Sequence, residues 1–183
     1  MFMKATGIVR RIDDLGRVVV PKEIRRTMRI REGQAMEIFT GREGEIVLKK
    51  YSPLEEMTDC AAEYVKALSS VCGHLVCISD HEQIVAASGP EQKSYLGKAI
   101  SPELDQALTD RRQIDAPPDS RESIPVLQDQ ECPSVHEIVT PILCSGDILG
   151  AVILLAKNAE TKMAETEKSL ARVAALFLGT RME

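Results

Sequence analysis

The sequence predicts an α+β protein in two parts, and three observations support this prediction. Residues 1–50 carry 12 Lys and Arg against 7 Asp and Glu, whereas residues 51–183 carry 11 against 21, so a basic head precedes an acidic body. The head consists of short β-branched runs separated by turn residues. The body alternates helical and sheet-like stretches in the order helix, strands, helix, strands, helix. The charge contrast indicates that only the head meets a polyanion.

The head, residues 1–51, is expected to contain four strands and one short helix. The strands are predicted at 6–12, 17–20, 35–40 and 45–50. A turn at Asp13-Asp14-Leu15-Gly16 follows the first strand, and Gly41-Arg42-Glu43-Gly44 reads as a hairpin loop before the last. Pro21 cannot donate to a strand ladder but fits the first turn of a helix, which is predicted over 21–28.

The head is too small to be stable by itself. About fifty residues with two Phe and no Trp bury too little apolar surface to offset the conformational entropy of the chain. Dimerisation would let two half-cores complete each other. A two-fold symmetric dimer also suits duplex DNA, whose pseudo-palindromic sites share that symmetry.

The body, residues 54–183, begins after a boundary at Tyr51-Ser52-Pro53 and is expected to carry a helix at each end. A heptad-like seam at alternating spacings of three and four runs through Leu54, Met57, Ala61, Tyr64, Leu68 and Val71. A second seam of the same kind runs through Met163, Thr166, Leu170, Val173 and Phe177. The seams either join copies of the chain or cover the sheet of their own domain, and the pattern leaves both open.

Between these helices the body is expected to be sheet-like. Strands are predicted at 74–79, 83–87, 136–143 and 148–156, the last two forming a hairpin around Cys144-Ser145-Gly146-Asp147. A helix is predicted over 102–112 with Ser101 as its N-cap. Residues 116–121, which contain two prolines, are predicted to be a loop.

The basic residues of the head are concentrated, because residues 4–31 hold nine Lys and Arg but three Asp and Glu. The planar guanidinium of arginine can bind a phosphate or a guanine edge through two hydrogen bonds. The alternative is a basic surface that serves only solubility. The concentration favours nucleic-acid binding, and the scarcity of aromatic residues favours a duplex over a single strand.

Residues 1–51, from Lys4 through Gly16-Arg17, Pro21 and Arg25-Arg26 to Lys49-Lys50-Tyr51, closely resemble the AbrB-type transition-state regulators of spore-forming bacteria. The resemblance implies a dimeric swapped-hairpin β-barrel followed by a GAF-like α+β domain with flanking helices, and a homotetramer. It implies an activator or repressor of sporulation genes. It also implies that DNA contacts come from Arg10, Arg17, Arg25 and Arg26, with Lys4 and Arg11 as helpers.

No catalytic constellation, metal-ligand set or phosphate-binding glycine loop is recognisable, so we expect no enzyme, no metal and no cofactor. The sequence has no apolar run long enough for a bilayer and no signal-peptide pattern, which predicts a cytoplasmic, nucleoid-associated protein.

Two other functions use the same head. Swapped-hairpin antitoxins share the Gly-Arg-Val-x-Val-Pro pattern, but they carry a short disordered tail where this chain has a patterned domain. The body could also sense a small molecule of unknown identity and thereby control DNA binding.

Overall fold

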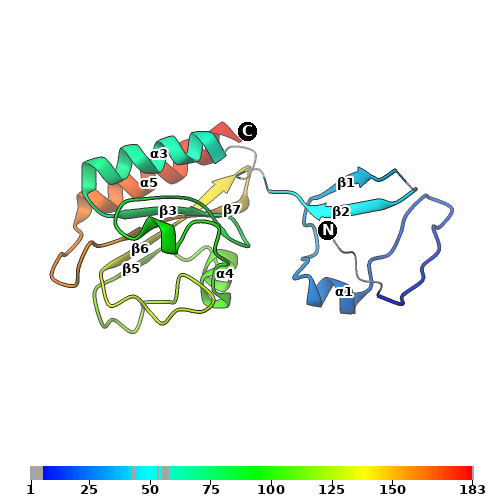
Figure 1. Ribbon diagram of the computed structural model, residues 1–183, viewed down its shortest axis with the longest axis horizontal. Coiled ribbons are helices and arrows are strands. Elements are labelled where there is room, and N and C mark those ends of the chain that lie inside the picture. Colours follow the sequence, from blue (N-terminus) through cyan, green and yellow to red (C-terminus); the bar gives the residue numbers. More distant parts are fainter. Residues whose placement is uncertain (1–5, 43, 53, 55–57, 183) are drawn as a thin grey trace. The chain divides into compact units, whose positions relative to one another are not determined.

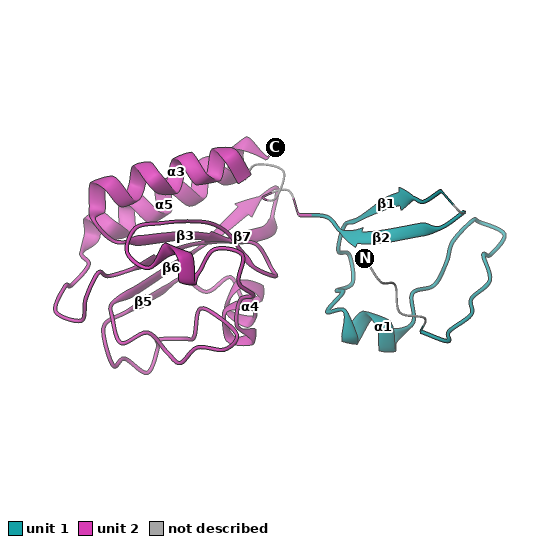
Figure 2. Ribbon diagram, in the orientation of Figure 1, with its two compact units in different colours: residues 1–51 teal, residues 52–183 magenta. Residues whose placement is uncertain are grey.

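The computed structural model describes residues 6–42, 44–52, 54 and 58–182. The chain divides into two compact units, Met1–Tyr51 and Ser52–Glu183, which are coloured separately in Figure 2. We call the first unit the head and the second unit the body.

The head contains one short helix and one β-hairpin (Figure 1). Its elements are α1 (Lys22–Thr27), β1 (Met36–Thr40) and β2 (Ile46–Lys50). The strands are antiparallel and in register from Met36 opposite Lys50 to Thr40 opposite Ile46. The amide of Gly41 donates to the carbonyl of Glu45 over 2.8 Å and closes the loop, which confirms the predicted hairpin. Glu43 of that loop lies outside the described residues.

The predicted strands at 6–12 and 17–20 are not present in the single chain. Within the described head, β1 and β2 form the one strand ladder, so the single chain closes no barrel. A strand needs a hydrogen-bonding partner, and the sequence pattern cannot say whether that partner lies in the same chain. The dimeric swapped-hairpin barrel remains a prediction.

The body is built on a five-stranded antiparallel sheet. Its strands are β3 (Leu75–Ser79), β4 (Ile84–Ser88), β5 (Ile114–Ala116), β6 (Glu137–Cys144) and β7 (Asp147–Leu155). They are arranged in the order β4-β3-β7-β6-β5. The helices and the sheet together confirm the predicted α+β class. The short β5 was not predicted, because its three residues are too few to show a period.

Both faces of this sheet are covered. Two helices, α3 (Thr58–Cys72) and α5 (Glu165–Arg181), lie side by side on one face, while α4 (Pro102–Thr109), the 3₁₀ turn η1 (Gln92–Ser94) and long loops cover the other (Figure 1). Neighbouring residues of β6 therefore enter different cores, Ile138 on the α3–α5 side and Val139 on the loop side. Burial on both faces explains why the strands read as continuous apolar runs.

The residues of the two helical seams differ in burial. On α3, Ala61 and Leu68 of the seam are buried against the sheet of the body itself. On α5 the buried face is instead Ala171, Ala174, Ala175, Leu178 and Gly179, and the seam residues Val173 and Phe177 are exposed. Internal cover is therefore correct for most of α3. In the second seam, Met163 is buried and Leu170 packs against the same core, whereas Val173 and Phe177 point to solvent. Met57 of the first seam lies outside the described residues.

The helix α4 begins as predicted. The hydroxyl of Ser101 accepts a hydrogen bond from the amide of Leu104 over 2.9 Å, and Pro102 occupies the first turn. None of the helices in the described part of the chain has the length and apolarity that a membrane span requires.

Candidate nucleic-acid interface

A tight turn in the head fixes the direction of Arg17. The carboxylate of Asp13 accepts hydrogen bonds from the amides of Leu15 (3.0 Å) and Arg17 (2.8 Å), and from Nε of Arg17 (2.8 Å). The backbone and side-chain hydrogen bonds from Arg17 lower the pKa of Asp13 below its usual range. The side chain of Arg17 is nevertheless 68% exposed, so its guanidinium is oriented while still accessible to a ligand.

The helix α1 presents the next pair of arginines. The amide of Arg25 donates to the carbonyl of Pro21 over 2.9 Å, and Pro21 is the one buried residue in the described head. The helix ends where the amide of Ile30 reaches back to the carbonyl of Arg25 over 2.7 Å, with Arg29 in the left-handed region at φ +51°. Arg25 and Arg26 therefore both lie in the last turn of α1.

The two arginines of α1 differ in exposure. Arg26 is exposed, whereas Arg25 is half-buried and its Nε has no hydrogen-bond partner. Consecutive residues of a helix are rotated by about 100°, so the two side chains point in different directions. The buried Nε of Arg25 is itself closed to a ligand, whereas the exposed side chain of Arg26 can reach an acceptor such as a phosphate or a base edge.

The remaining predicted DNA-binding residues lie before the turn. Arg10 and Arg11 are exposed in a segment without secondary structure, and Lys4 lies outside the described residues. Figure 1 shows α1 on the side of the head away from the β1–β2 hairpin. The structure therefore places Arg17 in a hydrogen-bonded turn and Arg25 and Arg26 on a helix. Arg10 and Arg11 are not held by a helix or strand of the single chain.

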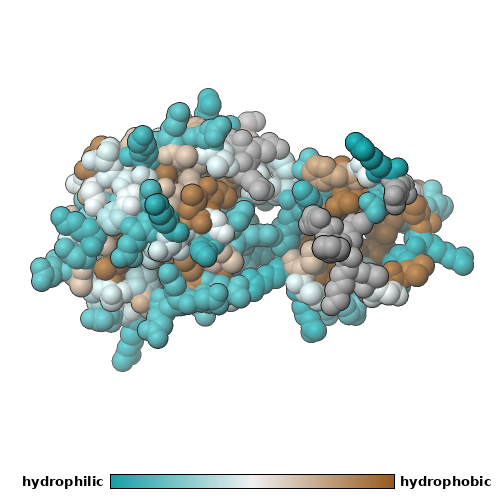
Figure 3. Space-filling model, viewed as in Figure 1, coloured by the Kyte–Doolittle hydropathy of each residue, from teal (hydrophilic) through white to brown (hydrophobic). Residues whose placement is uncertain are grey.

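The head exposes far more apolar side chain than a stable monomer would. Brown, apolar surface is prominent on the head in Figure 3. The exposed large apolar residues of the head are Ile8, Val9, Ile12, Leu15, Val18, Val19, Met28, Ile38, Phe39, Ile46, Leu48 and Tyr51. An exposed apolar surface of this extent indicates a protein–protein interface.

Sequence reasoning identified no site in the body, but the structure contains a cavity of about 390 Å³ on the loop side of the sheet. Leu75, Leu155 and Tyr95 give it an apolar wall, and Glu91, Glu131 and Lys157 supply charge. The lining residues come from the ends of two strands and from two loops far apart in sequence. No local motif could have identified the cavity, because the topology alone brings these residues together.

Comparisons with known proteins cover both units. The family described as "Stage V sporulation protein T C-terminal, transcription factor" matches residues 56–183. The family described as "Antidote-toxin recognition MazE, bacterial antitoxin" matches residues 9–56.

Two relatives from Bacillus subtilis (strain 168) are similar in sequence. Stage V sporulation protein T is 47% identical over 181 residues, which cover 99% of each chain. The transition state regulatory protein AbrB is 60% identical over 53 residues, 29% of this chain and 54% of the relative.

Two solved structures are similar to the body. A type II free methionine-R-sulfoxide reductase from Thermoplasma acidophilum aligns over 70% of this chain and 94% of its own with 12% identity and a TM-score of 0.51, which indicates a shared fold and no more. The cofactor-binding GAF domain of the nutrient sensor CodY from Clostridium difficile aligns over 67% and 83% with 14% identity and a TM-score of 0.49.

The full-length relative favours one of the functional classes predicted from the sequence. A match over 99% of both chains supports a transcription regulator over an antitoxin with a short tail, and a family of transcription factors agrees with the prediction of a non-enzymatic regulator. The chain therefore belongs to the stage V sporulation protein T family of transcription factors.

Proposed function

We propose that the chain regulates sporulation genes by binding duplex DNA as a dimer through its head. Arg10, Arg17, Arg25 and Arg26 make the principal contacts, and Lys4 and Arg11 assist them. The observation that carries the proposal is the pairing of an oriented, accessible Arg17 and an exposed Arg26 with a head 60% identical to a transition state regulator. The protein acts as activator or repressor in the cytoplasm, at the nucleoid.

Dimerisation is proposed to complete the core of the head. Twelve large apolar side chains are exposed there, and two heads facing each other would remove them from water. The segments 6–12 and 17–20 would then find strand partners in the second copy. DNA contacts from both copies would follow the two-fold symmetry of a pseudo-palindromic site.

We expect Ile38→Lys to break the head dimer. Ile38 lies on β1 and is 66% exposed in the single chain, so a charge there would be buried in a dimer core at a cost of several kcal/mol, on the order of 2–5. Sedimentation of the full chain should show its assembled mass fall by half. Glu32→Lys, an exposed residue of the turn between α1 and β1, is the control and should leave the mass unchanged. An unchanged mass for Ile38→Lys would contradict the proposed interface.

The C-terminal helices are proposed to join two dimers into a tetramer. Val71 at the end of α3 and Val173, Leu176 and Phe177 on α5 are exposed apolar residues. The ring of Phe177 stacks on Tyr64 at 5.0 Å between centroids, which links the exposed faces of the two helices. A four-headed assembly would bind two sites on one DNA and gain affinity through effective concentration.

Ligand control is proposed to act through the body, which we take to be GAF-like. The cavity on the loop side of the sheet could hold a small molecule, and the helices α3 and α5 lie on the opposite face. A ligand that favours one packing of these helices would change the assembly of the heads by linkage.

The antitoxin class is the second candidate, favoured by the family match over residues 9–56. A competition assay separates the regulator from the antitoxin. The full chain is bound to a labelled duplex, unlabelled duplex or single strand is added, and fluorescence anisotropy measures the displacement. For a regulator, unlabelled duplex should displace the labelled duplex from the protein, and single-stranded DNA should not. Failure to bind either, together with a co-purifying toxin, would favour the antitoxin.

A further inference from the structure

The body holds a carboxyl group in its core that no part of the proposed function uses. Glu137, the first residue of β6, is 0% exposed. Its Oε2 accepts hydrogen bonds from the hydroxyl of Ser123 (3.0 Å) and the amide of Ile124 (3.1 Å), while Oε1 is buried without a partner. The side chain thus fastens the long segment 117–135, between β5 and β6, onto the edge of the sheet.

Strand register places Glu137 beside the cavity. Leu75 is paired with Leu155, Leu155 with Glu137, and Glu137 with Ala116, so the four residues form one row across the sheet. Side chains directly opposite each other are about 5 Å apart. Leu75 and Leu155 line the cavity, and so do residues 130–135 of the segment that Glu137 fastens. The segment that Glu137 binds through Ser123 therefore also forms part of the cavity wall.

The surroundings of Glu137 disfavour a charge. Burial raises its pKa to about 7, even though the hydrogen bonds from Ile124 and Ser123 act in the opposite direction. Tyr95 and Cys77 face the same core, and burial raises the pKa of each to about 12, so both stay neutral near pH 7. Among the residues that the structure describes, no cation acts on the pKa of Glu137.

The charged groups on neighbouring strand positions are engaged elsewhere. His136 and Asp115 are joined over 2.8 Å, and Asp115 is joined to Lys168 of α5 over 2.6 Å. Since α5 covers the opposite face of the sheet, this network lies on the side away from the cavity. Glu131 and Lys157 belong to the cavity lining, and both are exposed.

We propose that Glu137 is a proton-operated latch: when protonated it holds segment 117–135 against the sheet, and when ionised it releases the segment and opens the wall of the cavity. A neutral acid in this position leaves one oxygen without a partner, whereas an ionised one leaves a buried charge with two hydrogen bonds, which is the costlier state. Release of the segment gives the carboxylate access to water. The cavity and any ligand in it are thereby coupled to pH.

The direction of the pH effect follows from linkage. The pKa is raised in the folded body relative to 4.5, so the stabilisation by the latch is complete below about pH 4.5 and is lost as pH rises through about 7. For one proton and a latch pKa of about 7, opening of the segment should become about tenfold more frequent between pH 6 and pH 8.

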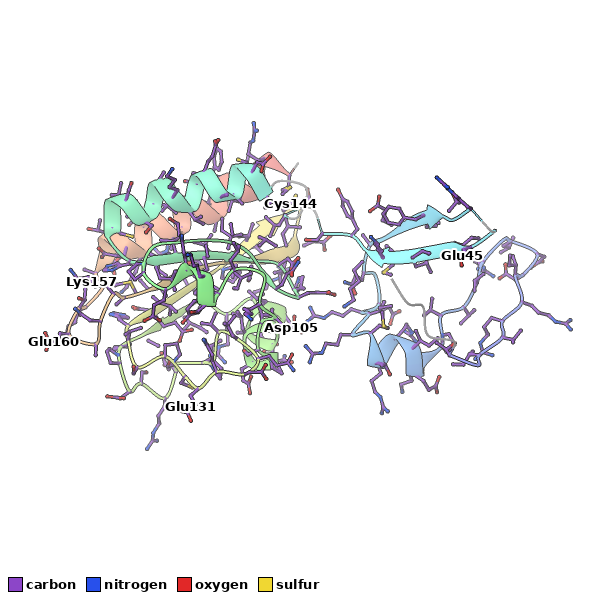
Figure 4. All side chains as sticks on the ribbon, in the orientation of Figure 1. Glu45, Asp105, Glu131, Cys144, Lys157 and Glu160 are labelled. Atoms are coloured by element: carbon purple, nitrogen blue, oxygen red, sulfur yellow. The ribbon has the colours of Figure 1, made fainter. Side chains whose placement is uncertain are left out.

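Hydrogen–deuterium exchange of the full chain, corrected for intrinsic exchange, tests the proposal. Amides of 117–135 should lose about tenfold protection from pH 6 to pH 8, while those of β7 keep theirs. In Glu137→Gln the protection should be equal at both pH values. Glu131→Gln removes an exposed carboxyl of the same segment, on the side of the body away from α3 and α5 (Figure 4), and should behave as the parent. Equal protection in the parent, or an unchanged loss in Glu137→Gln, would overturn the latch.

A second variant keeps the test decisive if Glu137→Gln fails to fold. Ser123→Ala removes a hydrogen bond that lowers the pKa of Glu137, so the midpoint of the opening transition should move to higher pH. A midpoint that stays in place or moves to lower pH would show that another group controls the segment. DNA is absent from these measurements, so their failure leaves the proposed DNA binding untouched.

Discussion

Replacing Arg25 and Arg26 together by alanine is expected to weaken binding of the full chain to its duplex site about 100-fold or more. Each arginine that binds a base edge or a phosphate contributes on the order of 1–3 kcal/mol, and 1.4 kcal/mol is a factor of ten. Both residues lie on α1, where the backbone is fixed at both ends by Pro21 and Ile30. The loss should therefore come from missing contacts while the helix is retained. Fluorescence anisotropy at fixed salt measures the effect.

Arg42→Ala is the matched control for this variant. Arg42 is an exposed cation of the same head, in the loop between β1 and β2, and is not among the proposed contacts. Its removal should change affinity by less than about threefold, the effect of one distant, screened charge. Equal losses in Arg42→Ala and in the double variant would mean that overall charge, rather than α1, determines binding.

The second large effect is expected in the body, where Gly179→Ala should lower the free energy of unfolding by about 2–4 kcal/mol. Helix propensity alone predicts the opposite sign, a gain of about 1 kcal/mol for alanine over glycine. A Cβ on Gly179 would lie 2.0 Å from the carbonyl oxygen of Leu143, an atom of the backbone of β6 that cannot move aside alone. Glycine is required here because α5 approaches the β6–β7 hairpin so closely.

Thr180→Ala is the control for this prediction. Thr180 is the next residue of α5 and is exposed, so alanine there should be neutral or slightly stabilising. Chemical denaturation followed by circular dichroism measures both variants. Gly179→Ala as stable as the parent would show that α5 does not pack against Leu143 as described.

Local signals allowed much of the fold to be predicted from the sequence. The loop between β1 and β2, the N-cap Ser101 and the β6–β7 hairpin all depend on residues within a few positions of one another, and all three are confirmed. The segments 6–12 and 17–20 have the composition of strands but find no partner in their own chain. Their pairing depends on a second copy, which a single sequence does not reveal.

The candidate sites likewise divide into features that are local in the sequence and features that arise only when the chain folds. The arginines of the head could be identified because their concentration is a local feature of the sequence, but their roles rest on resemblance and remain proposals. Glu137 stands between His136 and an apolar run, and nothing in that pattern distinguishes a buried acid from an exposed strand end. Its burial depends on Ser123 and Ile124, which approach it only after the loop has folded back. Similarly, the buried face of α5 consists mostly of small residues, Ala171, Ala174, Ala175 and Gly179 beside Leu178, because small side chains allow a close approach to the sheet.

The salt dependence of duplex binding by the full chain tests the central claim most directly. If arginines of two heads neutralise roughly 6–10 phosphates, the logarithm of affinity should fall linearly with the logarithm of salt concentration, with a slope of about −5 to −9. The affinity should then drop by roughly 10³ to 10⁵ between about 50 and 200 mM salt. A slope near zero, or no binding to duplex DNA at the lower salt concentration, would contradict the account.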